Sequence, residues 1–323
     1  MKVGILGTGN IARKMAYTLS QMDDAVCLAA AARDMARAEK FAREYGIKRA
    51  YDSYEKLVND PEVELIYIAT PHSLHYEHAK LCIMHGKPVL CEKPFMANAK
   101  QAKEILALAE EKNVFVTEAI WTRYMPSRTM VDAVIKSGQI GEIVSVTANL
   151  GYDLRNVKRL NDPALAGGAL LDVGIYPLSF VSMVLGNDIQ KTVSMCTKTK
   201  TGVDAQNSVI LKYPGGKLAS VHSSMEGATE QYGIVYGTKG YLIAENINNI
   251  DKIRIYSPDR ELVKELTPPA QITGFEDEVR ASMKALCEGK IECPQIPHSE
   301  IIFMMELMDS LREDWGIQFP FEL

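Results

Sequence analysis

The glycine-rich loop GTGNIA, near the start of the chain, constrains the fold more than any other feature of the sequence. The strand-like run KVGIL precedes this loop, and the amphipathic, helix-like run IARKMAYTL overlaps its end. Gly7 permits a tight turn, Gly9 lets a pyrophosphate approach the backbone, and Ala12 lets the helix pack closely. The N-terminus of that helix would then face the phosphates. We therefore predict a dinucleotide site that includes Gly7, Gly9, Asn10, Ile11 and Ala12, with an incidental tight turn as the alternative.

Strand-like and helix-like segments alternate from the start of the chain to about residue 119. The apolar runs VGIL, AVCLAAAA, ELIYIA, PVLCE and VFVTEA are separated by amphipathic stretches such as MARAEKFAREY and KQAKEILALAEE. This alternation predicts parallel strands joined by right-handed crossovers, with helices on both faces of the sheet. We predict a doubly wound, dinucleotide-binding Rossmann domain over residues 1–119.

Longer alternating runs replace this pattern in the second part of the chain. Runs such as IVSVTANLGY, NSVILKY and KLASVHSS, with turns at YPGGK and GTKG, predict an antiparallel sheet. Helical patterns near 124–137, 168–185, 275–288 and 299–315 are expected to cover one face of that sheet. We predict an α/β protein of two domains. The second, residues 120–323, is α+β on a large, mostly antiparallel sheet and serves substrate binding and oligomerisation.

Composition and charge exclude several classes of function. A net charge of −5 and a pI near 5.8 provide no clustered positive charge for nucleic acid. No apolar run approaches the roughly 18 residues that cross a bilayer, and the strand-like start MKVGIL leaves no room for a signal peptide. Six scattered cysteines without CxxC spacing indicate buried thiols. We therefore expect a cytoplasmic protein that binds neither nucleic acid nor membrane.

The end of the second predicted strand, AAARD, bears on the choice of nucleotide. An acidic residue at this point bonds the ribose hydroxyls of NAD and disfavours a 2′-phosphate. Here Ala32 stands near that position and Arg33 follows, which suits the 2′-phosphate of NADP through charge-assisted hydrogen bonds. Asp34 is a competing acidic residue, and Arg33 could instead be a surface charge stacked on the adenine. We predict NADP as the preferred cofactor and NAD as the alternative.

Four of the six histidines lie in the stretch TPHSLHYEHAKLCIMHGKP, which begins at Thr70. His72 follows the run ELIYIA, at the carboxyl end of a parallel strand, where such sheets bind ligands. His75 and His78 begin the next helix at a spacing of three, whereas helical zinc pairs use four, so we predict no metal site. We expect Thr70, His72 and His75 to border the ribose and nicotinamide, and His78 and His85 to be ordinary helix residues. A merely polar helix start is the alternative.

The sequence EKP, from Glu92 to Pro94, directly follows the run PVLC and lies at the same edge of the predicted sheet as His72. Pro94 ends the strand because it has no N–H to donate. A lysine held beside an oxidised nicotinamide could have its pKa lowered and could hydrogen-bond a substrate hydroxyl or carbonyl. A surface lysine fits the position equally well. We include Glu92 and Lys93 among the predicted cofactor-binding residues.

Three motifs in this order, GTGNIA, EKP and GGALLDVGIYPL, resemble the Gfo/Idh/MocA family of oxidoreductases, and the resemblance covers essentially the whole chain. The stretch EAIWTRYMPS and the tyrosine of the third motif are most similar to the dimeric dihydrodiol dehydrogenases and the related NADP-dependent xylose and anhydro-sugar enzymes. The resemblance implies a nicotinamide-dependent dehydrogenase or reductase that acts on the CH–OH groups of a sugar, polyol or cyclic trans-diol.

The resemblance also implies three catalytic residues. Lys93 corresponds to the family's lysine that orients and polarises the reacting oxygen, and the third motif supplies Asp172 and Tyr176. Inositol dehydrogenases have histidine where this chain has Tyr176, which makes an inositol substrate doubtful. Asp172 and Tyr176 are four residues apart on one helix face, which could meet Lys93 across the domain cleft. We expect Tyr176 to accept the hydroxyl proton, or Asp172 in its place.

Aromatic and basic residues extend the predicted site. Trp121 and Arg123 follow the sixth predicted strand, where the family contacts the nicotinamide and its ribose or phosphates. A core tryptophan and a surface arginine are the alternatives. Tyr152, at the end of the strand that leads into a predicted flap at 154–167, and Phe275 could form an aromatic wall for the substrate. Apolar packing explains these two residues nearly as well.

Two other classes of function compete with the dehydrogenase. One is a dinucleotide-binding regulator without turnover, because the same family includes a yeast galactose-regulatory protein of this kind. The joint presence of Lys93, Asp172 and Tyr176 favours catalysis. A biliverdin-type reductase is disfavoured, because it would not require both EKP and DVGIY. The resemblance finally implies a homodimer formed through the open face of the second-domain sheet, since an antiparallel sheet can leave one face uncovered.

Overall fold

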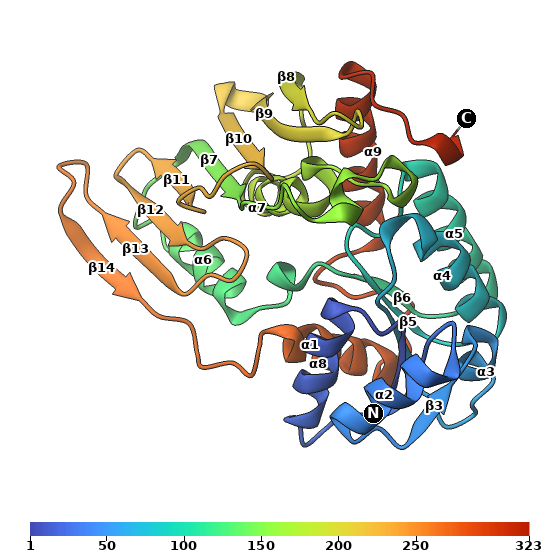
Figure 1. The fold of residues 1–323 in the computed structure, drawn as a ribbon. Helices are drawn as coiled ribbons and strands as arrows, with labels where there is room; N and C mark the ends of the chain where they lie inside the picture. The colour runs from blue at the N-terminus through green and yellow to red at the C-terminus, as the bar shows by residue number, and fades with distance from the viewer. Residues whose placement is uncertain (323) are drawn as a thin grey trace. The chain divides into compact units, whose positions relative to one another are not determined.

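The computed structural model describes residues 1–322, which form two compact units (Figure 1). The first unit contains Met1–Tyr124 and Gln271–Met305, and the second contains Met125–Ala270 and the chain from Glu306 onward. The first crossing between the units, after Tyr124, lies close to the boundary predicted at residue 119. The segment Gln271–Met305 clusters with the first unit and not, as predicted, with the second.

The first unit is built on a six-stranded parallel sheet with the order β3-β2-β1-β4-β5-β6. The doubly wound fold predicted from the alternating pattern is confirmed. The direction of winding reverses between β1 and β4, and open α/β sheets bind ligands at such a switch point, beyond the carboxyl ends of the strands. The strands are β1 (Lys2–Leu6), β2 (Val26–Ala31), β3 (Arg49–Tyr51), β4 (Leu65–Ile68), β5 (Val89–Glu92) and β6 (Val116–Ala119).

Several helices of the first unit begin at a residue that caps them. Asp34 accepts a hydrogen bond from the Arg37 N–H before α2, and Asn98 accepts one from the Gln101 N–H before α5. Such caps satisfy N–H groups that a helix leaves unpaired. The helices are α1 (Asn10–Ser20), α2 (Met35–Tyr45), α3 (Tyr54–Val58), α4 (His75–Met84), α5 (Ala99–Lys112) and α8 (Phe275–Cys287), with 3-10 turns at His72–Leu74 and Trp121–Arg123.

Contacts of the segment 271–305 explain the revised division of the chain. α8 packs against α1, and the hydroxyl oxygens of Thr18 and Thr273 lie 2.6 Å apart. The Val116 N–H donates to Ile291 O at 3.0 Å, so this segment also pairs with the edge strand β6. A helical pattern in the sequence indicates an apolar face but not the sheet on which that face packs. These contacts place α8 in the first unit and not over the second sheet.

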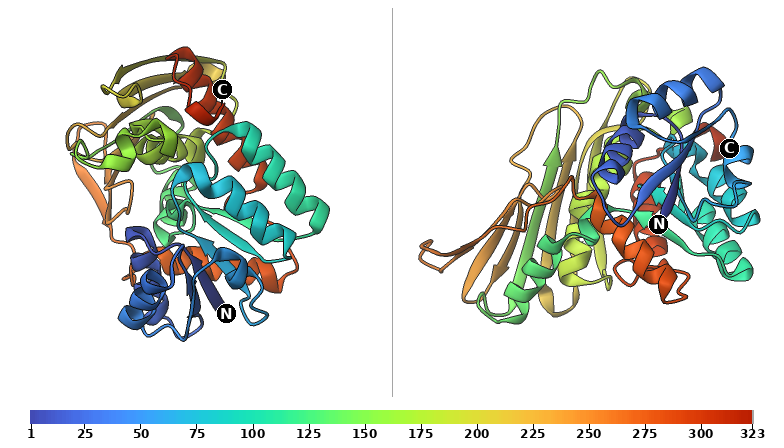
Figure 2. Two further views of the ribbon diagram at one scale, coloured as in Figure 1. Left: turned by 45° about the vertical axis from the view of Figure 1, so that its right-hand side comes forward. Right: turned by 90° about the horizontal axis from the view of Figure 1, so that it is seen from below.

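The second unit is built on an eight-stranded sheet with the order β14-β13-β12-β11-β7-β10-β9-β8 (Figure 2). Neighbouring strands are antiparallel except β7 and β10, so the predicted large and mostly antiparallel sheet is confirmed. Its last two strands, KIRIY and LVKEL, were not among the predicted runs. The strands are β7 (Ile143–Gly151), β8 (Lys191–Lys198), β9 (Asp204–Lys212), β10 (Leu218–Ser224), β11 (Gly233–Gly237), β12 (Gly240–Glu245), β13 (Lys252–Tyr256) and β14 (Leu262–Leu266).

Helices pack on one face of the second sheet. α7 (Ile175–Leu185) lies on β7, β10 and β11. α6 (Pro126–Lys136) is tied to α7 by the Arg128 guanidinium, which donates to Met183 O at 2.8 Å. The last part of α9 (His298–Asp314) also belongs to this unit, and just beyond it Trp315 Nε1 donates to Ser194 Oγ at 3.0 Å.

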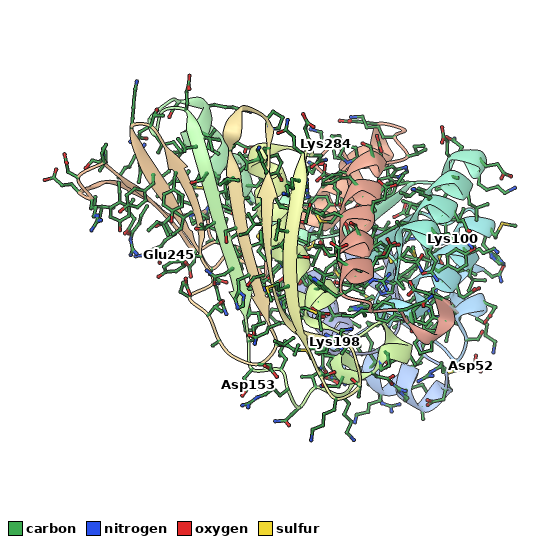
Figure 3. The ribbon with its side chains drawn as sticks, turned by 90° about the horizontal axis from the view of Figure 1, so that it is seen from above. Asp52, Lys100, Asp153, Lys198, Glu245 and Lys284 are labelled. Carbon is green, nitrogen blue, oxygen red and sulfur yellow. The ribbon has the colours of Figure 1, made fainter. Side chains whose placement is uncertain are left out.

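The other face of the second sheet exposes its side chains, and Figure 3 looks onto this face. Tyr241 packs between Tyr236 and Tyr256, with ring centroids 6.1 Å and 5.0 Å apart. Four large apolar side chains of β8, β9 and β10 are between 47% and 77% exposed: Val193, Met195, Ile210 and Leu218. We call these seven residues the open face.

The third motif forms an unusual helix. Residues Leu170–Gly174 make a single π-helical turn that continues into α7. Such turns are rare and occur frequently at functional sites. The helical stretch Pro163–Leu185 is also long and apolar enough to cross a membrane by length and composition alone, which differs from the prediction. Since 78% of its most apolar window is buried inside the protein, and a core helix passes the same test, this is weak evidence for a membrane span.

Candidate functional site

The glycine-rich loop between β1 and α1 has the shape that a pyrophosphate requires. Gly7 has a φ of +105°, and a Cβ added there would lie 2.9 Å from Ala69 O. Only glycine fits such a backbone without strain. A Cβ at Gly9 would come no nearer than 3.9 Å to Ala69 O, so space remains beside its backbone. The N–H groups of residues 10–12 have no acceptor within α1. The loop therefore fits the phosphates of a dinucleotide.

Beyond β2 the chain presents Ala32, Arg33 and Asp34. Ala32 is buried, and its N–H donates to Tyr51 O at 3.0 Å. Arg33 is exposed, and it is the first residue after β2 whose side chain is in contact with solvent. Asp34 Oδ1 accepts a hydrogen bond from the Arg37 N–H at 2.9 Å and caps α2. The acidic residue that competed with Arg33 in the sequence is thus engaged as a helix cap.

His75 ties together the loops that follow β4 and β5. Its side chain is fully buried, with Nε2 2.9 Å from Thr70 O and Nδ1 3.0 Å from Pro94 O. Burial lowers the pKa of His75, which favours the neutral ring. Both ring nitrogens face carbonyl oxygens of the protein, so His75 links the two loops next to Lys93. Its contact with the cofactor stays a prediction.

The other histidines of this stretch lie in different surroundings. His72 is buried in the 3-10 turn after β4, with its ring 5.8 Å from that of His75. His78 Nδ1 lies 2.9 Å from Thr70 Oγ1, and burial lowers the pKa of His78 to about 4. His85 Nδ1 lies 2.8 Å from a carbonyl oxygen of α4. Within residues 1–322, no three His, Cys, Asp or Glu side chains are grouped so as to hold a metal ion.

Two buried acids hold the backbone around Lys93, which is half-buried at the carboxyl end of β5. The Lys93 N–H donates to Glu92 Oε2 at 3.1 Å, and the Phe95 N–H donates to Glu118 Oε1 at 2.7 Å. Tyr67 donates a further hydrogen bond to Glu92. Burial raises the pKa of both carboxyl groups, that of Glu118 to about 7. Lys93 is therefore presented by a backbone that is fixed on both sides.

A cation and a third buried acid lie on α1 and α8. Lys14 Nζ lies 3.9 Å from the ring centroid of Trp121 and 4.4 Å from that of Phe275, and the two rings meet edge to face at 4.9 Å. Glu278 is fully buried, and among residues 1–322 neither of its carboxylate oxygens has a hydrogen-bond partner. Burial raises the pKa of Glu278 well above its ordinary value, the charge of Glu92 raises it further, and Lys14 opposes the rise.

Arg123 forms an ion pair with Glu300 of α9, and both side chains are largely buried. Breaking such a pair would leave an uncompensated buried charge. The pair therefore anchors the 3-10 turn Trp121–Arg123 within the first unit. Contact of Trp121 and Arg123 with the nicotinamide, its ribose or its phosphates stays a prediction.

In the second unit, Asp172 lies on the π-helical turn and Tyr176 at the start of α7, and both side chains are buried. Arg159, in the predicted flap, pairs with Asp172, with Nη2 3.0 Å from Oδ1. The Arg159 side chain is 46% exposed and that of Asp172 is 8% exposed. An adjacent guanidinium stabilises a carboxylate through a charge-assisted hydrogen bond. Arg159 of the predicted flap segment thus binds the carboxyl group of Asp172.

The two predicted substrate residues belong to different units. Phe275 packs on Trp121 in the first unit. Tyr152 follows β7 in the second unit, and its hydroxyl accepts a hydrogen bond from Asn248 Nδ2 at 3.2 Å. Each ring has a partner within its own unit, and their contact with a substrate stays a prediction.

Three residues that lie beside predicted site residues escaped the sequence analysis: Lys14 and Glu118 in the first unit, and Arg159 in the second. Glu118 stands in the apolar run VFVTEA, and a charge inside a buried strand is a usable signal because carboxyl groups are rarely buried without partners. Lys14 and Arg159 give no such signal. In the sequence, both look like ordinary surface residues. The aromatic rings that contact Lys14 lie more than 100 residues away, and the partner of Arg159, Asp172, lies on another element.

Comparison with known proteins decides the family. Residues 1–120 match the Gfo/Idh/MocA oxidoreductase family with its NAD-binding Rossmann fold, and residues 129–243 match the C-terminal domain of the same family. The chain belongs to the Gfo/Idh/MocA family. The resemblance that rested on three short motifs is confirmed, and so is the predicted fold class.

Relatives of this Gfo/Idh/MocA protein cover almost its whole length. The trans-1,2-dihydrobenzene-1,2-diol dehydrogenases of Mus musculus and Homo sapiens are each 35% identical to it, over 99% of this chain and 98% of their own. A 3-ketoreductase from Actinomadura kijaniata, in complex with NADP and TDP-benzene, is 25% identical with a TM-score of 0.88, and 97% of each chain is covered. A levoglucosan dehydrogenase in complex with NADH and levoglucosan, 18% identical, has a TM-score of 0.85 over 98% of this chain and 97% of that one.

The chain is therefore an NAD(P)-binding oxidoreductase of the Gfo/Idh/MocA family. Its glycine loop fits the cofactor, because Gly7 adopts a left-handed backbone and the space beside Gly9 is open. The predicted class of cofactor is confirmed, whereas the preference for NADP over NAD stays a prediction.

Proposed function

We propose that this Gfo/Idh/MocA enzyme transfers a hydride between NADP and the CH–OH or carbonyl carbon of a cyclic trans-diol, sugar or polyol. The observation that carries the proposal is the fixed Lys93 at the carboxyl end of β5, in the sheet whose glycine loop fits the dinucleotide. Open α/β sheets bind ligands at these strand ends. Relatives matched over 98% of their own length are named as dehydrogenases of a cyclic trans-diol.

Three side chains divide the work when a substrate alcohol is oxidised. The bound nicotinamide supplies the hydride acceptor. Tyr176 takes the hydroxyl proton, Lys93 hydrogen-bonds the reacting oxygen, and Asp172, paired with Arg159, supplies a negative charge. The alcohol thus loses a hydride and a proton and becomes a carbonyl, and reduction uses the same groups in reverse. Asp172 is the alternative proton acceptor, because interacting groups titrate as a pair.

The preference for NADP rests on the end of β2. Ala32 is small and buried, Asp34 is engaged as the cap of α2, and the exposed Arg33 supplies positive charge for an adenosine 2′-phosphate. Equal kcat/KM with NADP and NAD would contradict this preference.

The test measures the absorbance of reduced nicotinamide against cyclic trans-diols, aldoses, polyols and inositols, with NADP and with NAD. We expect turnover of a diol or an aldose with NADP. Lys93→Met removes the ammonium group and keeps an unbranched side chain, and it should lower kcat/KM by about 100-fold or more. The matched control is Lys100→Met, at an exposed lysine of α5 (Figure 3), which should retain wild-type kcat/KM.

A parallel titration of nucleotide binding separates the possible outcomes. Wild-type kcat/KM in Lys93→Met, or an equal loss in both lysine variants, would contradict the role of Lys93. No turnover by the wild type across the panel, together with tight nucleotide binding, would favour a regulator without catalytic activity over an enzyme.

We also propose that the open face of the second sheet binds a second copy of the chain. It combines four exposed apolar side chains on adjacent strands with the packed tyrosines Tyr236, Tyr241 and Tyr256. Exposed apolar patches of this kind often mark protein interfaces. Light scattering at micromolar concentration should give the mass of a dimer, and Met195→Glu should shift it towards the monomer. A wild-type monomer under these conditions would contradict the proposal.

A further inference from the structure

The π-helical turn that carries Asp172 lies against a group of buried polar side chains from β9 and β10. These are Asp204, Asn207 and Ser223, which are between 0 and 3% exposed. We call them the polar network. Burying a polar group costs free energy unless the group is hydrogen-bonded. The hydrogen-bond partners of these three side chains therefore indicate the role of the network. All of them belong to the second unit.

Asp204 contacts the start of the π-helical turn. Its Oδ2 accepts hydrogen bonds from the Leu170 N–H at 2.7 Å and from the Asn207 side-chain amide at 2.9 Å. The Leu170 N–H lies in the first turn of the helical segment, where N–H groups have no partner within a helix. Gly168 has a φ of +119°, and a Cβ added there would lie 2.3 Å from Asp204 Oδ1. The carboxylate therefore fills the space that a side chain at residue 168 would need.

Ser223 contacts the end of the same turn. Its hydroxyl donates to Asn207 Oδ1 at 2.9 Å, and a Cβ added at Gly174 would lie 2.9 Å from Ser223 Oγ. The amide of Asn207 thus donates to Asp204 with its nitrogen and accepts from Ser223 with its oxygen. The network spans the turn from Gly168 to Gly174 and is connected from one end to the other.

A π-helical turn requires such support. The i→i+5 hydrogen bonds of a π-helix are rare compared with those of an α-helix, and an uncommon backbone conformation persists only where its surroundings over-determine it. Relaxation of this turn to an α-helix would change the number of residues per turn between Leu170 and Gly174. The side chains on and after the turn would then rotate about the helix axis relative to β9 and β10.

We propose that Asp204, Asn207 and Ser223 are positioning residues that maintain the π-helical turn and thereby fix the orientation of Asp172 and Tyr176 for proton transfer. This inference rests on the proposed function, because it assumes that Asp172 and Tyr176 take part in the reaction. The network acts through the turn, by filling the space beside Gly168 and Gly174 and by accepting the Leu170 N–H.

Two variants weaken the network with little change in volume. Ser223→Ala removes the hydroxyl beside Gly174 and takes a donor away from Asn207 Oδ1. Asp204→Asn removes the negative charge of this side chain, so the two hydrogen bonds that Oδ2 accepts from the Leu170 N–H and the Asn207 amide are no longer charge-assisted and become weaker. The matched control is Ser182→Ala, which removes a hydroxyl of α7 that donates to Asn187 Oδ1 at 2.8 Å, beyond the turn.

The experiment combines amide hydrogen exchange of residues 168–180 with kcat, KM and nucleotide Kd, all measured well below the Tm of each variant. In Ser223→Ala and Asp204→Asn, the amide hydrogens of residues 170–174 should exchange at least 10-fold faster than in the wild type. Both variants should also lower kcat at least 10-fold. Nucleotide Kd should not change, because the glycine loop belongs to the first unit. Ser182→Ala should match the wild type in exchange of the turn and in kcat.

The outcomes separate a positioning role from a merely structural one. A lower Tm with wild-type exchange in the turn, or faster exchange with wild-type kcat, would overturn the proposal. If the wild type turns over no member of the substrate panel, the proposed function fails. Hydrogen exchange then still reports whether the network maintains the turn.

Discussion

Replacement of Glu278 should stabilise the protein. Glu278 is fully buried on α8, and in the described chain neither of its carboxylate oxygens has a hydrogen-bond partner. Such a group costs about 1–3 kcal/mol when uncharged and more when ionised. Burial is the largest cause of its raised pKa, which means that the attraction of Lys14 does not offset the desolvation. Glu278→Met puts an apolar side chain of similar length in this place and removes the cost.

The gain should depend on pH, with a sign that follows from the raised pKa. Below the pKa of an unfolded glutamate, about 4.3, Glu278 is protonated in both states and carries no ionisation cost. Above it, the unfolded chain releases the proton while the folded state keeps it. The folded state then binds more protons, so stability falls as the pH rises. This fall continues until the pH passes the raised pKa of the folded state.

Thermal unfolding of wild type and Glu278→Met at pH 5 and pH 8 measures both effects. A gain of about 2 kcal/mol at pH 8 corresponds to a rise in Tm of roughly 4–8 °C for a domain of 150–250 residues. The rise should be smaller at pH 5. The control is Glu276→Met on the same helix, since Glu276 is also buried but accepts the N–H groups of residues 272, 273 and 274. This control should lower Tm. Equal gains at both pH values, or a lower Tm for Glu278→Met at pH 8, would refute the reasoning.

Two further substitutions test the proposed chemistry. Tyr176→Phe keeps the ring and removes the hydroxyl, so it should lower kcat by about 10²- to 10⁴-fold while nucleotide Kd stays the same; near-normal turnover would exclude Tyr176 as the proton acceptor. Arg33→Ala should weaken NADP binding by about 10- to 150-fold, because it removes charge-assisted hydrogen bonds of about 1.5–3 kcal/mol. NAD binding should not change, and equal weakening of both nucleotides in a fluorescence titration would exclude recognition of the 2′-phosphate by Arg33.

The first sheet was predictable because each part of it has a local signal. Gly7 and Gly9 follow a strand and precede a helix, and alternating strand and helix patterns leave few topologies open. Lys93 was predicted as a site residue in the same way, because the short motif EKP overlaps the end of a buried strand. Each of these patterns involves only residues that are close together in the sequence, and it can therefore be recognised without the structure.

The features that the sequence did not reveal depend on contacts between distant residues. The pattern of α8 shows an apolar face, but only its packing on α1 shows that this face belongs to the first unit. The carbonyl oxygens that contact His75 belong to Thr70, Pro94 and Phe95, and the residues next to His75 in the sequence do not reveal these contacts. The π-helical turn at Leu170–Gly174 contacts Asp204 and Ser223, which follow its last residue by 30 and 49 positions.

The two buried carboxyl groups of Asp204 and Glu278 differ in their hydrogen bonds, and therefore in how much of their desolvation is offset. Burial raises the pKa of both, that of Asp204 to about 6. Asp204 accepts hydrogen bonds from Leu170 and Asn207, which offset part of its desolvation, and the turn that it supports accounts for its place. Glu278 accepts none in residues 1–322, so the fold alone does not account for it.

Natural proteins commonly depart from stabilising choices at functional sites. Glu278 belongs to the unit that carries the glycine loop and Lys93, and its pKa responds to Glu92 and Lys14. We therefore expect Glu278→Met to lose activity while it gains stability. A variant with higher Tm and wild-type kcat and nucleotide Kd would show that the buried carboxyl group of Glu278 serves neither the fold nor the reaction.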